Sequence, residues 1–163
     1  MDFKRDILPL KNILFRTALR ITLNREEAED VVQDTLLKLW ERRSELSAVQ
    51  NLEAFALTAA RNLALDHKNL AYNQTIPLDE EQHDRQDVYQ PSVQDTLVQQ
   101  ERISHIRQLI DRLPEKQRTA IQLRDIEGKT YKEIAEIMAT TEADVKINIY
   151  RGRNFLKNNC KML

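Results

Sequence analysis

Residues 130–145 read TYKEIAEIMATTEADV, and this stretch decides the fold. Thr130 and Glu133 can form a capping box, in which the two side chains satisfy free backbone N–H groups at a helix start. Thr141 can cap a second helix in the same way. Because only about three residues would join the two capped helices, the spacing predicts a helix-turn-helix.

Small and apolar residues elsewhere in this stretch fit the same geometry. Ala135 lies where the motif needs a small residue for close helix approach, and Val145 lies where the second helix needs an apolar anchor. Ala139 occupies the turn position that usually holds glycine, so either it is left-handed, at about 1 kcal/mol, or the turn differs. Gly152 costs the second helix about 1 kcal/mol relative to alanine, and it either loosens the helix end or permits close approach to DNA. An ordinary helical hairpin is the alternative interpretation.

The rest of the chain also predicts helices. Apolar residues recur with the 3.6-residue period over residues 6–22, 25–44 and 51–69, which can pack as a small bundle. Pro114 suits the first turn of a later helix that stops near Gly128. The chain has only two glycines, which argues against strand-rich folds and excludes Gly-rich phosphate loops. We therefore expect an all-α protein of two small helical domains.

Charge is divided unevenly along the chain, although the net charge is only −1. Residues 70–101 carry one basic and seven acidic residues, whereas residues 102–163 carry 13 basic and eight acidic ones. Residues 145–163 are basic and contain no acid. This last stretch is either a solvated helix end, where cations suit the helix dipole, or a surface that faces phosphates.

A linker is expected between the two helical domains. Residues 72–91 are acidic, contain Pro77 and Pro91 and lack a sustained apolar period, which predicts a flexible acidic linker. The expected domains are therefore residues 1–71 and 92–163.

Composition argues against several classes of protein. The single cysteine, Cys160, excludes an intrachain disulfide and a multi-cysteine zinc site. The three histidines, His67, His83 and His105, are scattered and form no ligand-spaced cluster. We expect no enzyme, no catalytic residue, no bound metal and no cofactor. No run approaches the ~20 apolar residues of a membrane span, and no secretory signal is seen, so we expect a cytoplasmic protein without membrane insertion.

Several motifs together resemble a known family. LPEKQR (113–118), LRDIEG (123–128) and YKEIA (131–135) resemble region 4 of bacterial sigma-70 factors. AEDVVQDT (28–35), continuing to Trp40, resembles their region 2, and ARNLALD (60–66) resembles the promoter-reading helix that follows. The order of the motifs, with a linker and no domain between them, is similar to the extracytoplasmic-function group. The resemblance covers about residues 8–70 and 92–158.

The resemblance implies a function and a set of partners. Such a factor binds the RNA polymerase core through its clamp coiled coil and flap, and it directs promoter-specific transcription initiation. Region 2 reads the −10 element of promoter DNA, region 4 reads the −35 element, and the factor helps to open the duplex. A cognate anti-sigma factor is also implied, which could tether this otherwise monomeric bacterial protein at the inner membrane.

The resemblance places the polymerase contacts on the outer face of the second predicted helix. Spacings of three, four and eight residues keep these side chains on one face. They are Asp30, Gln33, Asp34 and Lys38. A mixed-charge face of this kind could equally be solvated. Trp40, the only tryptophan, is either core or the rim of a contact, and we favour core.

The −10 contacts fall, by resemblance, on the third predicted helix and the loop after it. They are Arg61, Asn62, His67, Lys68 and Asn69. Melted bases are captured by pockets, stacking and amide hydrogen bonds. The sequence departs from the family here, because Phe55 stands where tryptophan is common and Leu57 and Thr58 replace positions that are often aromatic and basic. Arg61 could instead pair with a carboxylate inside the bundle.

The −35 contacts fall, by resemblance, on the last predicted helix. They are Thr141, Glu142, Asp144, Lys146, Ile147, Asn148, Arg151, Arg153 and Lys157. Early residues of a recognition helix usually approach bases, and later basic residues hold the backbone. Lys146 and Asn148 are therefore the expected base readers, and Arg151, Arg153 and Lys157 are the expected phosphate contacts.

Two other functions remain open from the sequence. One is a helix-turn-helix regulator that binds duplex DNA, as a dimer on two half-sites, without touching the polymerase core. In that case the N-terminal domain would be a sensor or dimer module. The other is a protein that only binds other proteins, which leaves the basic C-terminal helix unexplained.

Overall fold

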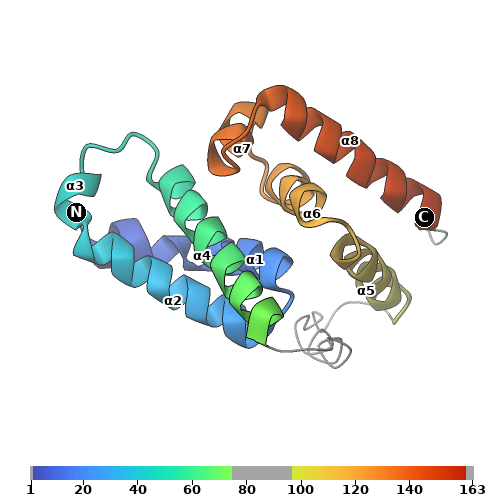
Figure 1. Cartoon of the computed structure of the whole chain (residues 1–163), viewed down its shortest axis with the longest axis horizontal. Coiled ribbons are helices and arrows are strands. Elements are labelled where there is room, and N and C mark those ends of the chain that lie inside the picture. Colours follow the sequence, from blue (N-terminus) through green and yellow to red (C-terminus); the bar gives the residue numbers. More distant parts are fainter. Residues whose placement is uncertain (1, 75–96, 161–163) are drawn as a thin grey trace.

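The computed structural model describes residues 2–74 and 97–160, and within these ranges the regular elements are all helical (Figure 1). This confirms the predicted all-α class. The expected linker, residues 72–91, lies outside the described residues except for 72–74, which are the end of a helix.

The N-terminal unit is a bundle of three long helices. Its elements are a π-helical turn (Phe3–Ile7), a 3-10 turn (Leu8–Leu10), α1 (Lys11–Thr22), α2 (Arg25–Glu41), the short α3 (Arg43–Leu46) and α4 (Leu52–Gln74). Helices α1, α2 and α4 pack on one another. The first helix begins later than the predicted residue 6, because Pro9 has no backbone N–H and restricts the residue before it.

The C-terminal unit contains four helices. They are α5 (Leu97–Asp111), α6 (Glu115–Ile121), which a π-helical stretch (Gln122–Ile126) prolongs, α7 (Tyr131–Ile137) and α8 (Glu142–Asn159). The capping box at the start of α7 is present, with both Thr130 and Glu133 accepting the expected backbone N–H groups. Thr141 accepts from the backbone of Asp144 at 3.1 Å and caps α8. The helix-turn-helix is therefore confirmed.

The turn between α7 and α8 keeps its usual geometry without glycine. Ala139 has φ = +54°, in the left-handed region. Of the two alternatives for this position, the strained alanine is the one that the structure shows.

Ala139→Gly is expected to raise the free energy of unfolding by about 1 kcal/mol, because glycine has no Cβ to strain at positive φ. Urea denaturation measures the change. The matched control is Ala143→Gly, an exposed and helical position in α8, where glycine should lower stability by up to about 1 kcal/mol. A loss of stability at both positions would contradict the expectation.

The two units share one continuous core. Buried side chains of the N-terminal unit, such as Ala18 and Ala60, belong to the same apolar cluster as Leu123 and Ile134 of the C-terminal unit. Helices α1 and α4 contact α6 and α7 (Figure 1), and we call this contact the seam. The two regions are therefore packed together.

Gly152 serves the packing of the C-terminal unit. It is buried on the inner face of α8, and a Cβ there would collide with Cδ1 of Ile121 in α6. The interpretation that Gly152 permits close approach to DNA is therefore wrong: the close neighbour is α6.

Gly152→Ala is expected to lower the free energy of unfolding by about 1 kcal/mol, because overpacking outweighs the gain in helix propensity. Ile121→Val removes the colliding Cδ1 and costs about 1 kcal/mol alone. In the double variant the two losses should not add, since the valine leaves room for the new methyl group. Strict additivity in thermal or urea denaturation would refute the proposed collision.

Candidate nucleic-acid interface

Helix α8 separates a buried face from an exposed one. Val145, Ile149 and Gly152 face the core of the C-terminal unit. Most of the predicted −35 residues lie on the other side: Glu142, Lys146, Ile147, Arg151, Arg153 and Lys157 are exposed, Asp144 and Asn148 are half-buried, and Thr141 is the exposed N-cap. The exposed side of the helix is therefore mainly polar and basic.

Several of these side chains are already held in place. The ammonium of Lys146 lies 5.3 Å from the centre of the Tyr131 ring, a cation–π contact. Asn148 donates from its side chain to the backbone oxygen of Asp144 at 2.9 Å. To read a base, Lys146 must leave the ring and Asn148 must leave that carbonyl.

The basic residues in the second half of α8 differ in whether their side chains are paired with an acidic residue. Arg153 is paired with Asp125, with Nε donating to Oδ2 at 3.1 Å, and this hydrogen bond raises the pKa of its guanidinium. Arg151 and Lys157 are exposed, and no side-chain partner is seen for either among the described residues. Of the three predicted phosphate contacts, these two are therefore the most accessible.

Sequence reasoning missed one residue on this face. Tyr150 is 67% exposed and follows Ile147, 48% exposed, by three positions, so that both stand on the outer side of α8. The signal was available in the sequence, because Tyr150 also lies four positions after Lys146. Ile147 and Tyr150 together form an exposed apolar stripe among the polar side chains of this face.

The predicted −10 residues have different surroundings: some are exposed to solvent, one contacts α2, and one lies in the seam. Asn62, Lys68 and Asn69 are exposed on α4. His67 is half-buried, and its Nε2 lies 4.0 Å from the Asp34 carboxylate of α2. The end of α4 thus touches the face that was predicted to bind the polymerase.

Arg61 does not face solvent in this arrangement. It is 8% exposed, and its guanidinium contacts the Glu115 carboxylate through Nη2–Oε1 at 3.1 Å and Nε–Oε2 at 3.3 Å. Of the two interpretations of Arg61, the structure shows pairing with a carboxylate. The partner, however, comes from α6 in the other unit and not from the bundle.

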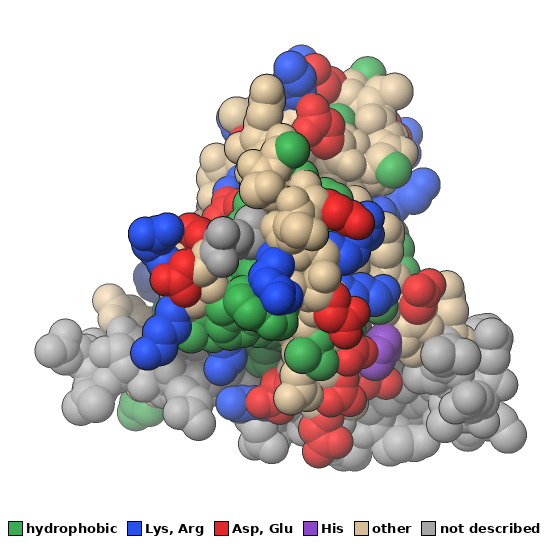
Figure 2. Space-filling model, turned by 90° about the vertical axis from the view of Figure 1, so that its left-hand side faces the viewer, with side chains coloured by type: hydrophobic (Ala, Val, Ile, Leu, Met, Phe, Trp, Pro, Cys, Tyr) green, Lys and Arg blue, Asp and Glu red, His purple; other side chains and the backbone are tan. Residues whose placement is uncertain are grey.

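The outer face of α2 is open. Asp30, Gln33, Asp34 and Lys38 are all exposed on it, while the inner face is buried against α1 and α4. Figure 2 looks at the end of the molecule where α3 lies, and there acidic and basic side chains are intermixed around an exposed apolar patch. A surface with both signs of charge suits a protein partner better than a phosphate backbone.

Trp40 is half-buried at the edge of the N-terminal core. Its ring meets Phe3 edge-on, with centroids 5.5 Å apart, and the Arg43 guanidinium lies 4.1 Å above it. Trp40 therefore packs against the edge of the core and is not one of its buried residues, so the structure does not decide between core and contact rim.

Ion pairs cross the seam between the two units, and the sequence did not reveal them. They are Arg16–Glu127 (2.8 Å), Arg20–Asp111 (2.6 Å), Arg61–Glu115 (3.1 Å) and Lys129–Glu53. The Arg20–Asp111 pair is buried on both sides, and the hydrogen bond from Arg16 to Glu127 raises the pKa of the arginine. The seam is therefore polar and specific as well as apolar.

Arg118 lies in α6, on the other side of the seam, and caps the C-terminal end of α1. It is 3% exposed, and its guanidinium donates to the backbone oxygens of Arg20 and Ile21, the latter at 3.2 Å, and of Leu113 at 2.7 Å. The last carbonyls of a helix lack intrahelical donors. A buried cation there satisfies them and complements the helix dipole.

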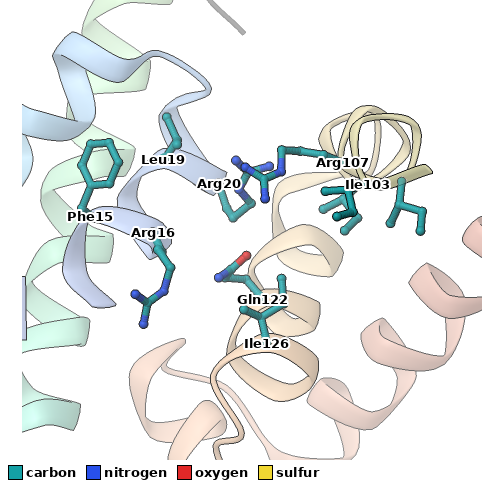
Figure 3. Close-up of a pocket in the computed structure, with 10 residues that line it drawn as sticks. Phe15, Arg16, Leu19, Arg20, Ile103, Arg107, Gln122 and Ile126 are labelled. Atoms are coloured by element: carbon teal, nitrogen blue, oxygen red, sulfur yellow. The ribbon is translucent and has the colours of Figure 1, made fainter. Parts of the chain in front are cut away.

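A cavity of about 350 Å³ opens where the seam meets α5. Phe15, Leu19 and Arg20 of α1 line one side, and Ile103 and Arg107 of α5 face them across it (Figure 3). The two units are thus tightly joined at α6 and α7 and less completely joined at α5.

Neither a membrane span nor a metal site is seen in the described ranges. Residues 2–74 and 97–160 contain no helix that is long and apolar enough to cross a bilayer. The same residues contain no group of three His, Cys, Asp or Glu side chains that could hold a metal ion.

Comparisons of the sequence and of the structure with known proteins both find sigma factors. The sigma-70 region 2 family matches residues 7–71, and the sigma-70 region 4 family matches residues 104–156. The ECF RNA polymerase sigma-E factor of Haemophilus influenzae is 31% identical over 86% of this chain and 78% of its own length. SigE of Mycolicibacterium smegmatis, an ECF sigma factor, is 27% identical over 89% of this chain and 56% of its own length.

Solved structures that span both units are also similar to this chain. The sigma factor RpoE of Bartonella quintana, in complex with the anti-sigma factor NepR, has a TM-score of 0.75 and 26% identity. The match covers 96% of this chain and 95% of that one.

Proposed function

Because this chain belongs to the extracytoplasmic-function group of sigma-70 RNA polymerase sigma factors, we propose that it binds the polymerase core and selects promoters through their −10 and −35 elements. The proposal rests on one observation: the same chain has two separate exposed surfaces. One is the mixed-charge face of α2, and the other is the polar and basic face of α8. A regulator that binds only DNA needs the second surface but has no use for the first.

The α2 face is the proposed contact with the clamp coiled coil of the core. Asp30 and Asp34 are exposed one turn apart and can pair with basic side chains of a partner helix, and Lys38 can pair with an acidic one. Leu37, 55% exposed beside Lys38, supplies apolar area. The C-terminal unit is proposed to contact the flap.

The α8 face is the proposed reader of the −35 element. In the major groove, Lys146 suits guanine and Asn148 suits adenine, while Ile147 can meet a thymine methyl group. Arg151 and Lys157 then hold phosphates on either side. Arg153 can join them if it leaves Asp125.

Region 2 is proposed to read the −10 element through α4. Asn62 and Asn69 can hydrogen-bond to unstacked bases, and Lys68 and Arg61 can contact the strand. We further propose that the protein works in the bacterial cytoplasm and is controlled by an anti-sigma factor, as the Bartonella relative is bound by one.

The test is competition for the polymerase core. Purified protein is titrated onto bacterial core enzyme in the presence of a labelled housekeeping sigma factor, and it should displace that factor. The reconstituted holoenzyme should then initiate transcription from a promoter with matching elements. Failure to bind core, with retained affinity for duplex DNA, would identify a DNA-binding regulator instead.

A further inference from the structure

The aromatic ring of Tyr131 contacts two cationic side chains beside the first turns of α8. The guanidinium carbon of Arg124 lies 4.3 Å from the centre of the ring, and the ammonium of Lys146 lies 5.3 Å from it. Both distances are within the about 6 Å over which an aromatic face attracts a cation. Side chains from the π-helical stretch, α7 and α8 therefore meet at one ring.

The ring itself is fixed in place. Tyr131 is the first residue of α7 and follows Thr130, whose capping box with Glu133 sets where the helix begins. The Tyr131 side chain is half-buried and packs against the apolar core. Because both the backbone and the core hold the ring, it is not free to follow a cation that moves toward DNA.

The two cations differ in how firmly they are held. Arg124 is half-buried and also donates from Nη1 to the backbone oxygen of Lys129 at 2.9 Å, which gives it a second anchor. Lys146 is exposed and makes the longer of the two ring contacts. Among residues 2–74 and 97–160, the ring is the only hydrogen-bonding, ionic or aromatic partner seen for Lys146. Lys146 is therefore the cation that can leave the ring.

The magnitudes also favour the release of Lys146 when a base is available. The two cations are at most about 10 Å apart, which is about one Debye length at 0.1 M salt, so they still repel each other in part. At an exposed site, a cation–π contact favours the ring-bound position of a lysine about two- to fivefold. A well-formed contact with a guanine edge discriminates by about 5- to 150-fold. The guanine edge is therefore the stronger competitor for the ammonium.

We propose that Tyr131 is a positioning residue of the −35 site: its ring holds Lys146 in the free protein and competes with DNA for the same ammonium, while Arg124 stays on the ring in both states. This inference rests on the proposed function. Because the contact with Lys146 is present only without DNA, it lowers the contribution of Lys146 to binding by about two- to fivefold.

The first experiment follows Lys146 directly by NMR in the full-length chain with isotope-labelled lysine. The ring should shift the ε-methylene protons of Lys146 upfield, and Lys146→Met identifies their signal by its loss. Tyr131→Leu should abolish the upfield shift, and Tyr131→Phe should keep it. Saturation with duplex DNA should abolish it too, and the duplex carries the −35 sequence that the reconstituted holoenzyme selects from a randomised promoter pool. An upfield shift that persists in the complex would overturn the inference.

The second experiment is a double-mutant cycle on the same duplex, with dissociation constants from fluorescence anisotropy. Tyr131→Leu is made once with Lys146 present and once in a Lys146→Met chain, so that any loss through folding or other contacts is common to both. The effect of the leucine on affinity should be about two- to fivefold more favourable when Lys146 is present. Tyr131→Phe should show no such difference.

The matched control removes another ring that a cation contacts. Phe155 also lies on α8, and the Arg112 guanidinium carbon is 5.5 Å from the centre of its ring. The effect of Phe155→Leu should not depend on residue 146.

The outcomes separate this inference from the proposed function. Equal effects of Tyr131→Leu in the two backgrounds would show that the ring does not compete with DNA for Lys146. A more favourable effect in the Lys146→Met chain would show that the ring holds Lys146 in the complex, and either result overturns the inference alone. If the holoenzyme selects no −35 sequence, the proposed function is wrong, and the inference fails with it.

Discussion

Asp30→Arg combined with Asp34→Arg should weaken binding to the RNA polymerase core by at least about 100-fold, since truncating one side of a close charge pair costs about 2–5 kcal/mol and reversal adds repulsion. Both carboxylates are exposed on the outer face of α2, so folding should be unaffected. Fluorescence competition against a housekeeping sigma factor measures the loss.

The control for this prediction carries the same change in charge at other sites. Glu101→Arg with Glu136→Arg alters two exposed carboxylates, one on α5 and one on α7. Core binding by this chain should stay within about threefold of the unchanged protein, as expected when rim charges act mainly on association rates. Equal losses in both double variants would mean that net charge, and not the α2 face, governs binding.

Arg118→Met should lower the free energy of unfolding by about 3–5 kcal/mol, the usual cost of breaking a buried charged network. Methionine fills much of the volume but leaves the backbone oxygens of Arg20 and Ile21 without their donor. Urea denaturation followed by circular dichroism measures the loss.

Arg102→Met is the matched control, because Arg102 is exposed on α5. Its cost should stay within about 0.5 kcal/mol, as for most surface positions. A cost below about 1 kcal/mol for Arg118→Met would show that water replaces the guanidinium, and that the seam does not depend on this side chain.

Features that depend on neighbours in the sequence could be predicted. Capping by Thr130 and Thr141, the apolar anchor Val145 and the amphipathic helices all follow from local spacing, and all are present. The exposure of the α2 and α8 faces also follows, because a helix that buries one stripe must expose the opposite one.

Features that depend on distant parts of the chain could not be predicted. Arg61 and Glu115 are 54 positions apart, and Arg118 reaches carbonyls 97 and 98 positions away. No sequence period links such residues. Gly152 shows the same limit, since its role is set by Ile121 on another helix.

The shared core has a thermodynamic consequence for the separation of the two units. Parting them exposes apolar side chains that one cluster now buries, so opening should carry a positive heat-capacity change. The stabilisation that comes from apolar burial weakens on cooling. The stabilisation that comes from ion pairs such as Arg20–Asp111 also changes with temperature. The fraction of separated chains should therefore rise in the cold, so that the packing of the two units would respond to temperature.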